Sequence, residues 1–139
     1  MPGNLVVDAS VIAKFYFQEA DSESARSLLI SGVGIVVPDF LFIEIASIAA
    51  KYTRRGWSSE ERAADAVSAV RELVDQSVPM ALLADRAFHF AVQHGFSAYD
   101  GAYVALAEME GLAMVTADER LVRRAADAGL SRLVRSLAS

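Results

Sequence analysis

The sequence predicts an α/β domain in which helices cover both faces of a central, mainly parallel sheet of four to five strands. Short apolar runs, typical of strands buried on both faces, alternate along the chain with longer stretches of helical period. This alternation indicates βαβ units, whose strands pair in parallel. The chain has 139 residues, the usual length of one domain, and contains neither repeats nor a Pro/Gly-rich linker. We therefore expect residues 1–139 to form a single three-layer α/β/α sandwich.

Glycine and proline divide the first half of the chain into elements. The apolar run 5–7 indicates a buried strand, and the turn at Gly32 and Gly34 separates a helix from a second apolar run. Pro38 stands where a helix can begin, and Gly56 ends that helix. The expected elements are strand 5–7, helix 10–17, helix 20–31, strand 35–37 and helix 40–55.

Capping residues mark the helices of the second half. Three Ser or Thr residues, each followed three positions later by an acid, have the spacing of a capping box: Ser58, Ser97 and Thr116. Pro79 lies in the run 78–83 and restricts it to an edge strand, because proline cannot donate a ladder hydrogen bond. The expected elements are helix 58–76, strand 78–83, helix 85–94, helix 97–110, strand 112–115, helix 116–128 and strand 132–134.

Composition excludes several classes of site. The chain has no cysteine, so disulfides, thiolate metal sites and thiol nucleophiles are absent, and His89 and His94 lack the spacing of a zinc hydrolase. A metal must then be held by oxygen, which indicates Mg²⁺ or Mn²⁺. No apolar stretch approaches the about 20 residues of a membrane helix. The first four residues lack the basic region of a secretory signal, so we expect a cytoplasmic protein with no membrane contact.

Four carboxylates stand where charge is unexpected. Asp8 and Asp118 follow apolar strands, Asp100 opens a largely apolar helix, and Glu44 is the single charge within 40–50. Each has a simpler explanation: an Asp at a strand end or helix start, including Asp39, serves as an N-cap, and a buried Glu can be protonated or paired with a cation. Parallel strands, however, bring their carboxyl ends to one edge, where ligands of such sheets bind.

The same four carboxylates together favour a metal pocket. The predicted topology brings two strand-end aspartates and two helix-borne acids toward one sheet edge. Ionised carboxylates placed close together repel each other unless a divalent cation is present. Mg²⁺ needs few protein carboxylates and keeps several waters. The residues themselves therefore predict an acidic, oxygen-lined metal site.

Four blocks carry these acids in a fixed order. They are LVVDASV at 5–11, PD at 38–39 followed by Glu44, YDGAYVALAE at 99–108 and VTADERL at 115–121. These blocks resemble the motifs of PIN-domain ribonucleases, and more narrowly those of the VapC-type toxins of prokaryotic toxin–antitoxin pairs. The resemblance runs from Leu5 to about Ala126 and implies a PIN-like α/β/α fold. One departure is Gly101, where many members have Ala, which slightly weakens the helix.

The resemblance also implies an activity. By it, the chain is an Mg²⁺- or Mn²⁺-dependent endoribonuclease, a hydrolase in which a metal-activated water attacks RNA and leaves a 5′-phosphate and a 3′-hydroxyl. The acidic quartet carries over onto Asp8, Glu44, Asp100 and Asp118. The first, third and fourth of these would hold the metal, with Glu44 acting directly or through water. The small hydroxyl positions fall on Ser10 and Thr116, which would orient ligands or the substrate phosphate.

Partners follow from the same resemblance and from apolar composition. The implied partners are an RNA substrate and a cognate VapB-type antitoxin, whose tail reaches the acidic site in the family. An excess of aromatic side chains in two short helices predicts an apolar groove for the antitoxin and a homodimer surface: Phe15, Tyr16, Phe17, Phe40 and Phe42.

The net charge of −5, from 13 basic and 18 acidic side chains, argues against broad charge-driven binding to nucleic acid. The acidic quartet alone supplies four of these negative charges, which bound metal would largely neutralise. Of the basic residues 11 are arginines, which suit phosphate and base contacts. Those near the acids either contact RNA or complement helix dipoles: Arg54, Arg55, Arg120, Arg123 and Arg124.

Two other functions remain open at this point. One is a catalytically inactive PIN fold used only for binding, against which the intact quartet argues. The other is phosphoryl transfer with Asp8 as nucleophile. Haloacid-dehalogenase-like phosphatases need a second Asp where this chain has Ser10, and receiver domains need a late Lys, whereas no Lys follows Lys51.

Overall fold

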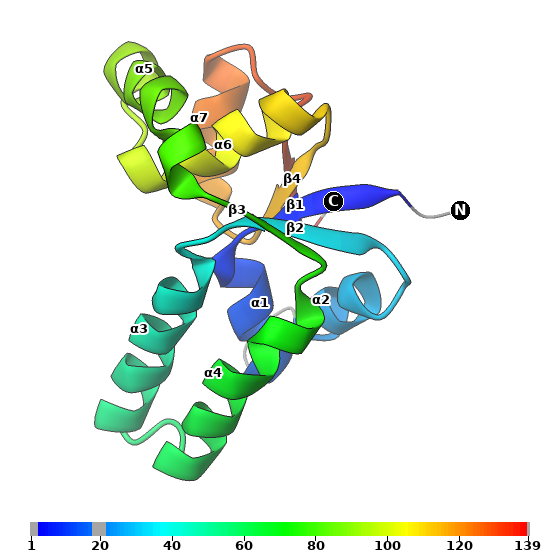
Figure 1. Cartoon of the computed structure of the whole chain (residues 1–139), viewed down its shortest axis with the longest axis vertical. Helices are drawn as coiled ribbons and strands as arrows, with labels where there is room; N and C mark the ends of the chain where they lie inside the picture. The colour runs from blue at the N-terminus through cyan, green and yellow to red at the C-terminus, as the bar shows by residue number, and fades with distance from the viewer. Residues whose placement is uncertain (1–2, 18–21, 139) are drawn as a thin grey trace.

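A five-stranded parallel sheet with the order β3-β2-β1-β4-β5 forms the middle layer of the structure (Figure 1). This computed structural model describes residues 3–17 and 22–138. The strands are β1 Asn4–Val7, β2 Gly34–Pro38, β3 Gln76–Val78, β4 Met114–Thr116 and β5 Val134–Ser136. The prediction of a mainly parallel sheet of four to five strands is confirmed.

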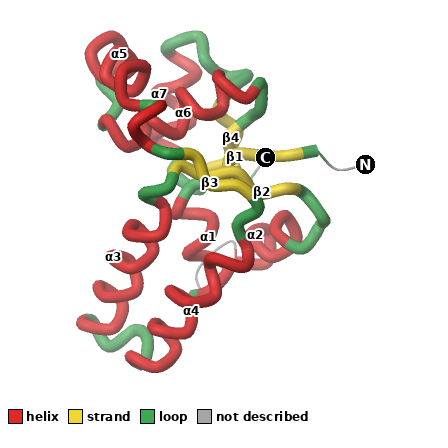
Figure 2. Tube along the Cα trace, viewed as in Figure 1, coloured by secondary structure: helices red, strands yellow, loops and turns green. Residues whose placement is uncertain are grey.

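Helices cover both faces of the sheet, as expected. They are α1 Ala9–Tyr16, α2 Ser22–Leu29, α3 Leu41–Arg54, α4 Glu60–Leu73, α5 Ala84–His94, α6 Ala98–Glu110 and α7 Glu119–Asp127. Figure 2 shows α1 to α4 on one side of the sheet and α5 to α7 on the other, with α3 and α4 extending away as a pair. Among the helices that the structure describes, none combines the length and apolar character needed to cross a bilayer.

The order of the strands creates a switch point in the sheet. From β1 the chain builds outward to β2 and β3, and then returns to the other side of β1 to add β4 and β5. In open parallel sheets a crevice forms outside the carboxyl ends of the strands where the direction of winding reverses. In this fold that place lies beyond the ends of β1 and β4.

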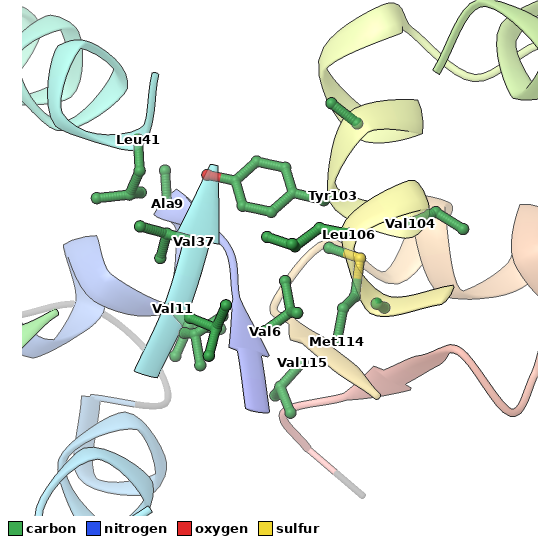
Figure 3. Packing of buried hydrophobic residues seen from close by; sticks show 14 of the residues in the cluster. Val6, Ala9, Val11, Val37, Leu41, Tyr103, Val104, Leu106, Met114 and Val115 are labelled. Atoms are coloured by element: carbon green, nitrogen blue, oxygen red, sulfur yellow. The ribbon is translucent and has the colours of Figure 1, made fainter. Parts of the chain in front are cut away.

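The central strands and the helices that follow them share one apolar core. Val6, Val37 and Met114 are buried in the sheet, and Leu41 and Leu106 pack against them from opposite layers (Figure 3). Burial of side chains of this size contributes about 1.5–3 kcal/mol each. This core fixes the beginnings of α1, α3 and α6 relative to the sheet edge.

Several sequence-based boundaries are wrong for local reasons. Ser59, not Ser58, caps α4, and its Oγ accepts a hydrogen bond from Arg62 N at 3.2 Å. Thr116 ends β4 rather than capping α7, since Asp118 is the cap. Pro38 ends β2 instead of opening the next helix.

Other boundaries shift by a few residues. The strand expected at 78–83 is Gln76–Val78, and after Pro79 the chain forms a 3₁₀ turn at Met80–Leu82. The strand expected at 132–134 is Val134–Ser136. For the helix expected at 20–31, α2 covers Ser22–Leu29, and residues 20 and 21 lie outside the described residues.

Of the aromatic residues expected to line a partner groove, most pack into or against the core, and Phe40 also lines an apolar groove. Phe17 and Phe40 are only 5% and 7% exposed, and the other three pack partly buried against the core. Their rings contact neighbouring helices: Phe17 contacts Tyr52 of α3, and Phe40 contacts Tyr103 of α6. Large exposed apolar side chains do occur elsewhere, at Ile30, Ile43, Trp57, Met80, Leu82, Phe88, Val92, Tyr99 and Met109.

Gly101 lies where α6 approaches the backbone of α5 most closely. A Cβ at this position would stand 2.7 Å from the carbonyl oxygen of Ala87 and 3.3 Å from its Cα. The glycine therefore permits a contact between helices, which outweighs the slight loss of helix propensity expected from the sequence. The same packing positions Asp100, the preceding residue.

We expect Gly101→Ala to destabilise the protein. The clash is with backbone atoms, so the two helices must separate, and overpacking of this kind costs about 1–3 kcal/mol. In an exposed helix the same change would add about 1 kcal/mol of stability. Urea unfolding measures the difference. Gly3→Ala is the control, because a Cβ there meets nothing within 4 Å; equal or greater stability of Gly101→Ala would contradict the prediction.

Candidate active site

The four predicted carboxylates all lie at the carboxyl edge of the sheet. Asp8 follows β1 and caps α1, and Asp118 follows the neighbouring β4 and caps α7. Glu44 lies in the first turn of α3, and Asp100 in the first turn of α6. These two helices begin on opposite faces of the sheet, so the acids approach the switch point from both layers.

Asp8 is the most tightly held of the four. It is 7% exposed, and its Oδ1 accepts hydrogen bonds from Ser10 N at 3.1 Å, Ser10 Oγ at 2.5 Å and Val11 N at 3.3 Å. Its Oδ2 accepts a hydrogen bond from Thr116 Oγ1 at 2.5 Å. Both carboxylate oxygens are thus fixed by donors from the end of β4 and the start of α1.

Ser10 and Thr116 connect the two strand ends. Ser10 Oγ also accepts a hydrogen bond from Ala117 N at 3.0 Å, and Thr116 Oγ1 accepts one from Asp118 N at 3.0 Å. The two hydroxyl oxygens are 3.5 Å apart. Through these bonds the hydroxyls orient Asp8 and hold the turn that carries Asp118.

Glu44 is half-buried and has a partner that the sequence did not reveal. Its Oε1 accepts a hydrogen bond from the Tyr103 hydroxyl at 2.6 Å. Figure 3 shows the Tyr103 ring extending from α6 toward Ala9 and Leu41, at the starts of α1 and α3. A signal was present: Tyr103 lies three residues after Asp100, on the same face of α6.

The acids influence one another electrostatically. Burial, chiefly, raises the pKa of Asp8 to about 6, against the opposing hydrogen bonds from Ser10 and Thr116, and the charge of Asp100 adds to the increase. Burial also raises the pKa of Glu44, and the charges of Asp8 and Asp100 act in the same direction, while the Tyr103 hydroxyl opposes them. The pKa of Asp100 is raised by burial and by Asp118. The charge of Asp100 therefore acts on both Asp8 and Glu44, and the charge of Asp118 acts on Asp100.

The sequence model of the PIN domain matches residues 5–127 of this chain. The chain belongs to the PIN domain family. It is similar to Ribonuclease VapC3 of Pyrobaculum aerophilum, with 34% identity over 122 residues that cover 86% of this chain and 93% of the relative. The family proposed from the sequence blocks is therefore confirmed.

Solved structures share the PIN fold of this chain. PAE2754 from Pyrobaculum aerophilum has a TM-score of 0.70 at 20% identity, covering 99% of this chain and 93% of its own. Mycobacterium tuberculosis VapC20, a Sarcin-Ricin loop cleaving toxin, has a TM-score of 0.67 at 22% identity. The match covers 86% of this chain and 94% of the VapC20 chain. A chain of a toxin-antitoxin complex from Klebsiella pneumoniae has a TM-score of 0.68 at 15% identity. The match covers 96% of this chain and 98% of that chain. At these identities they establish the three-layer fold.

Three other candidate residues, Asp39, His94 and Arg124, have structural roles in this PIN domain. Asp39 Oδ1 accepts a hydrogen bond from Met80 N at 3.1 Å, so it fixes the turn after β3. His94 is the last residue of α5, before Gly95 with a φ of +72°, as expected. His89 is exposed on the same helix. Arg124 Nη1 donates to Gly95 O at 2.8 Å, and its charge lowers the pKa of nearby Asp100.

The donor chemistry of this PIN domain suits a hard divalent cation. The converging side chains are carboxylates, and a nearby cation would offset the repulsion that adds to burial in raising the pKa values of Asp8, Glu44 and Asp100. Among the residues that the structure describes, no three or more Asp, Glu or His side chains are placed to hold one ion together. Mg²⁺ is often bound by one or two carboxylates with several waters, so the donors fit such an ion.

Asp8→Asn should stabilise the protein increasingly as the pH rises. The pKa of Asp8 is about 6 in the folded protein, against 3.8 as its ordinary value, so ionisation of the folded form is unfavourable. Below about pH 4 the Asp8 carboxyl is protonated in both the folded and the unfolded wild type, so its burial does not lower the free energy of unfolding through ionisation. This loss of stability grows between about pH 4 and pH 6 and is complete at higher pH. Urea unfolding at pH 4 and pH 8 measures the effect, with up to about 3 kcal/mol expected at pH 8. A gain that did not grow between these pH values would contradict the prediction.

Tyr103→Phe should raise the pKa of Glu44 further. The Tyr103 hydroxyl favours the ionised form of Glu44 by donating to it, and phenylalanine removes that bond. The Glu44 carboxyl carbon, followed by NMR during a pH titration, reports the change. Tyr99→Phe is the matched control, since Tyr99 is exposed on the same helix. Identical Glu44 titration in wild type and Tyr103→Phe would show that the bond has no such effect.

Proposed function

We propose that this PIN domain is a metal-dependent endoribonuclease of the VapC type, acting as the toxin of a type II toxin–antitoxin pair. The observation that carries the proposal is the convergence of four electrostatically coupled carboxylates at the switch point of the sheet. The 34% identity to Ribonuclease VapC3 over most of both chains supports RNA as the substrate. The chemistry is hydrolysis of an RNA phosphodiester to a 5′-phosphate and a 3′-hydroxyl.

In this proposal each residue of the site has a defined task. Asp8, Asp100 and Asp118 would hold Mg²⁺ or Mn²⁺, one or two of them directly and the others through bound water, with Glu44 acting directly or through water. The bound ion would supply a lowered pKa for the attacking water and neutralise charge on the phosphate oxygens. Ser10 and Thr116 fix the orientation of Asp8, which keeps the ligand from rotating away.

Tyr103 completes the site as a positioning residue. It is 2% exposed, and its hydroxyl holds Glu44 at the edge of the pocket. Because this bond favours the charged form, it keeps the Glu44 carboxylate available to bind a cation or its waters. Asp118 is exposed at the outer side of the site, where RNA would approach.

The geometry of Asp8 weighs against phosphoryl transfer through this residue. A nucleophilic carboxylate needs an oxygen that is free to attack, whereas both oxygens of Asp8 accept hydrogen bonds and the side chain is 7% exposed. The intact quartet likewise argues against an inactive binding module. Hydrolysis by water positioned at the four carboxylates fits the site best.

Protein partners are also part of the proposal. We infer a VapB-type antitoxin, supported by the toxin-antitoxin complex whose fold matches this chain, and a homodimer, with both acting in the cytoplasm. A groove of about 370 Å³ along α5 and the start of α6, with Phe40 also in its lining, provides apolar surface for one of these contacts. The exposed side chains Met80, Phe88 and Tyr99 line it.

Purified protein should cleave a mixture of tRNA, rRNA and mRNA when Mg²⁺ or Mn²⁺ is present, and EDTA should abolish cleavage. Asp8→Asn and Asp100→Asn should each lower the rate by about 100-fold or more, because each removes a ligand charge. Gel analysis of product ends checks the expected 5′-phosphate. Asp39→Asn is the matched control: this exposed Asp also follows a strand of the same edge, and an Asn retains its bond to Met80 N.

Two results would contradict the proposed function. Cleavage by Asp8→Asn or Asp100→Asn at the wild-type rate would exclude the mechanism. Absence of cleavage of any RNA by the folded wild type with either metal would favour the binding module.

A further inference from the structure

A second groove adjoins the acidic site and shares residues with it. The groove encloses about 260 Å³ and lies between α1, α3 and the start of α7. Its lining includes Ser10, Lys14, Ile48, Lys51, Tyr52 and Asp118. Ser10 and Asp118 belong to the acidic site as well, so the groove opens directly from the carboxylates. We refer to it as the lysine groove.

The lysine groove contains both lysines of the chain. All the other basic residues are arginines, so these two compact ammonium groups are concentrated in one place. Lys14 lies six residues after Asp8 along α1, and Lys51 lies seven residues after Glu44 on α3. At 1.5 Å per residue, these positions are about 9 Å and 10 Å further along the two helices. Positive charge therefore begins about two helical turns from the acids.

This arrangement suits a phosphate group next to the one being cleaved. A lysine ammonium is a strongly hydrated point charge that binds phosphate without requiring a fixed planar geometry. An RNA strand whose scissile phosphate lies at the carboxylates continues away from them on both sides. One arm of the RNA strand can extend along the lysine groove, where α1 and the part of α3 after Glu44 carry no acidic side chain that would repel it.

Aromatic surface continues beyond the lysine groove. The ring of Tyr52 contacts Trp57 edge to face, with centroids 5.3 Å apart, and Trp57 is 60% exposed. The guanidinium of Arg55 lies 5.1 Å from the centre of the Trp57 ring. Exposed aromatic rings and arginine guanidinium groups stack on unpaired bases. Along α3, the positively charged lysine groove is therefore followed by a surface on which bases can stack. This order favours RNA over an acidic peptide as the occupant.

We propose that Lys14 and Lys51 form a subsite for a backbone phosphate of single-stranded RNA next to the scissile phosphate. The proposal rests on the ribonuclease function proposed above and assigns the direction in which one arm of the substrate leaves the acidic site. The lysines are positioning residues that act through binding. The contact is to phosphate, so it carries no sequence preference.

The test measures the salt dependence of RNA binding. Wild type, Lys14→Gln and Lys51→Gln are titrated against a fluorescein-labelled oligouridylate over a range of KCl. Ca²⁺ replaces Mg²⁺, so that the acidic site carries a divalent ion, and gel analysis verifies that the strand stays intact during the titration. For single strands the slope of log affinity against log salt changes by about 0.7 for each phosphate contact. Because both lysines contact the same phosphate, each single variant should reduce the magnitude of the slope by part of this amount, and the double variant by about 0.7.

Two controls separate a local contact from a general change of charge. Arg132→Gln removes one positive charge before β5, at the amino edge of the sheet and away from the groove, and should leave the slope unchanged. Lys14→Arg and Lys51→Arg retain the charge and should restore the slope. Thermal unfolding verifies that each variant is folded.

The outcomes distinguish this subsite from the function on which it rests. A wild-type slope in both Gln variants, or an equal decrease in Arg132→Gln, overturns the subsite. Lysine variants that bind RNA normally but lose affinity for an acidic peptide also overturn it, since the groove would then serve a protein partner. Failure of the wild type to cleave RNA with Mn²⁺ overturns the ribonuclease function, even where RNA binding depends on both lysines.

Discussion

The burial of the Asp8 carboxylate is the constraint on which the site depends. A nearly inaccessible charge at the end of the central strand must be compensated, and the chain provides two hydroxyls and two backbone N–H groups for it. These donors come from α1 and from the end of β4, so compensation of one charge also joins two strand ends. The pKa of about 6 shows that compensation is incomplete. That residual unfavourable energy is available to a cation.

The apolar core determines where the other acids stand. Glu44 and Asp100 lie in first turns, where helix dipoles favour a negative charge, but burial still raises the pKa of each. Tyr103 links the core and the site: its ring packs against Phe40, and its hydroxyl holds Glu44. The close approach of α5 and α6 at Gly101 sets the position of the adjacent Asp100. Packing and chemistry are therefore coupled through neighbouring residues of one helix.

Much of the fold and the identity of the acids could be predicted from the sequence, whereas their partners could not. Periodicity and capping residues gave the order of elements and the parallel sheet, but hydrogen bonds decided between Ser58 and Ser59 and between Thr116 and Asp118 as helix caps. The bond from Tyr103 to Glu44 spans 59 residues: the spacing from Asp100 places Tyr103 on the site face of α6, but its partner on α3 follows only from the packing of the two helices. The aromatic excess predicted a partner groove, but of its members Phe40 lines the apolar groove while the others mainly pack against the core, because burial depends on the neighbouring helices as well as on composition.

The distribution of charge explains how an acidic protein can bind an acidic polymer. The net charge is −5, and four carboxylates are concentrated at one sheet edge, so without a cation this edge repels phosphate. A divalent ion reverses the sign of the field locally, over the few ångströms that one scissile group occupies. Neighbouring phosphates are not bound by that ion and still meet a chain of net negative charge. They therefore gain from fixed positive charge of their own, and both lysines of the chain lie about two helical turns from Asp8 and Glu44 along α1 and α3.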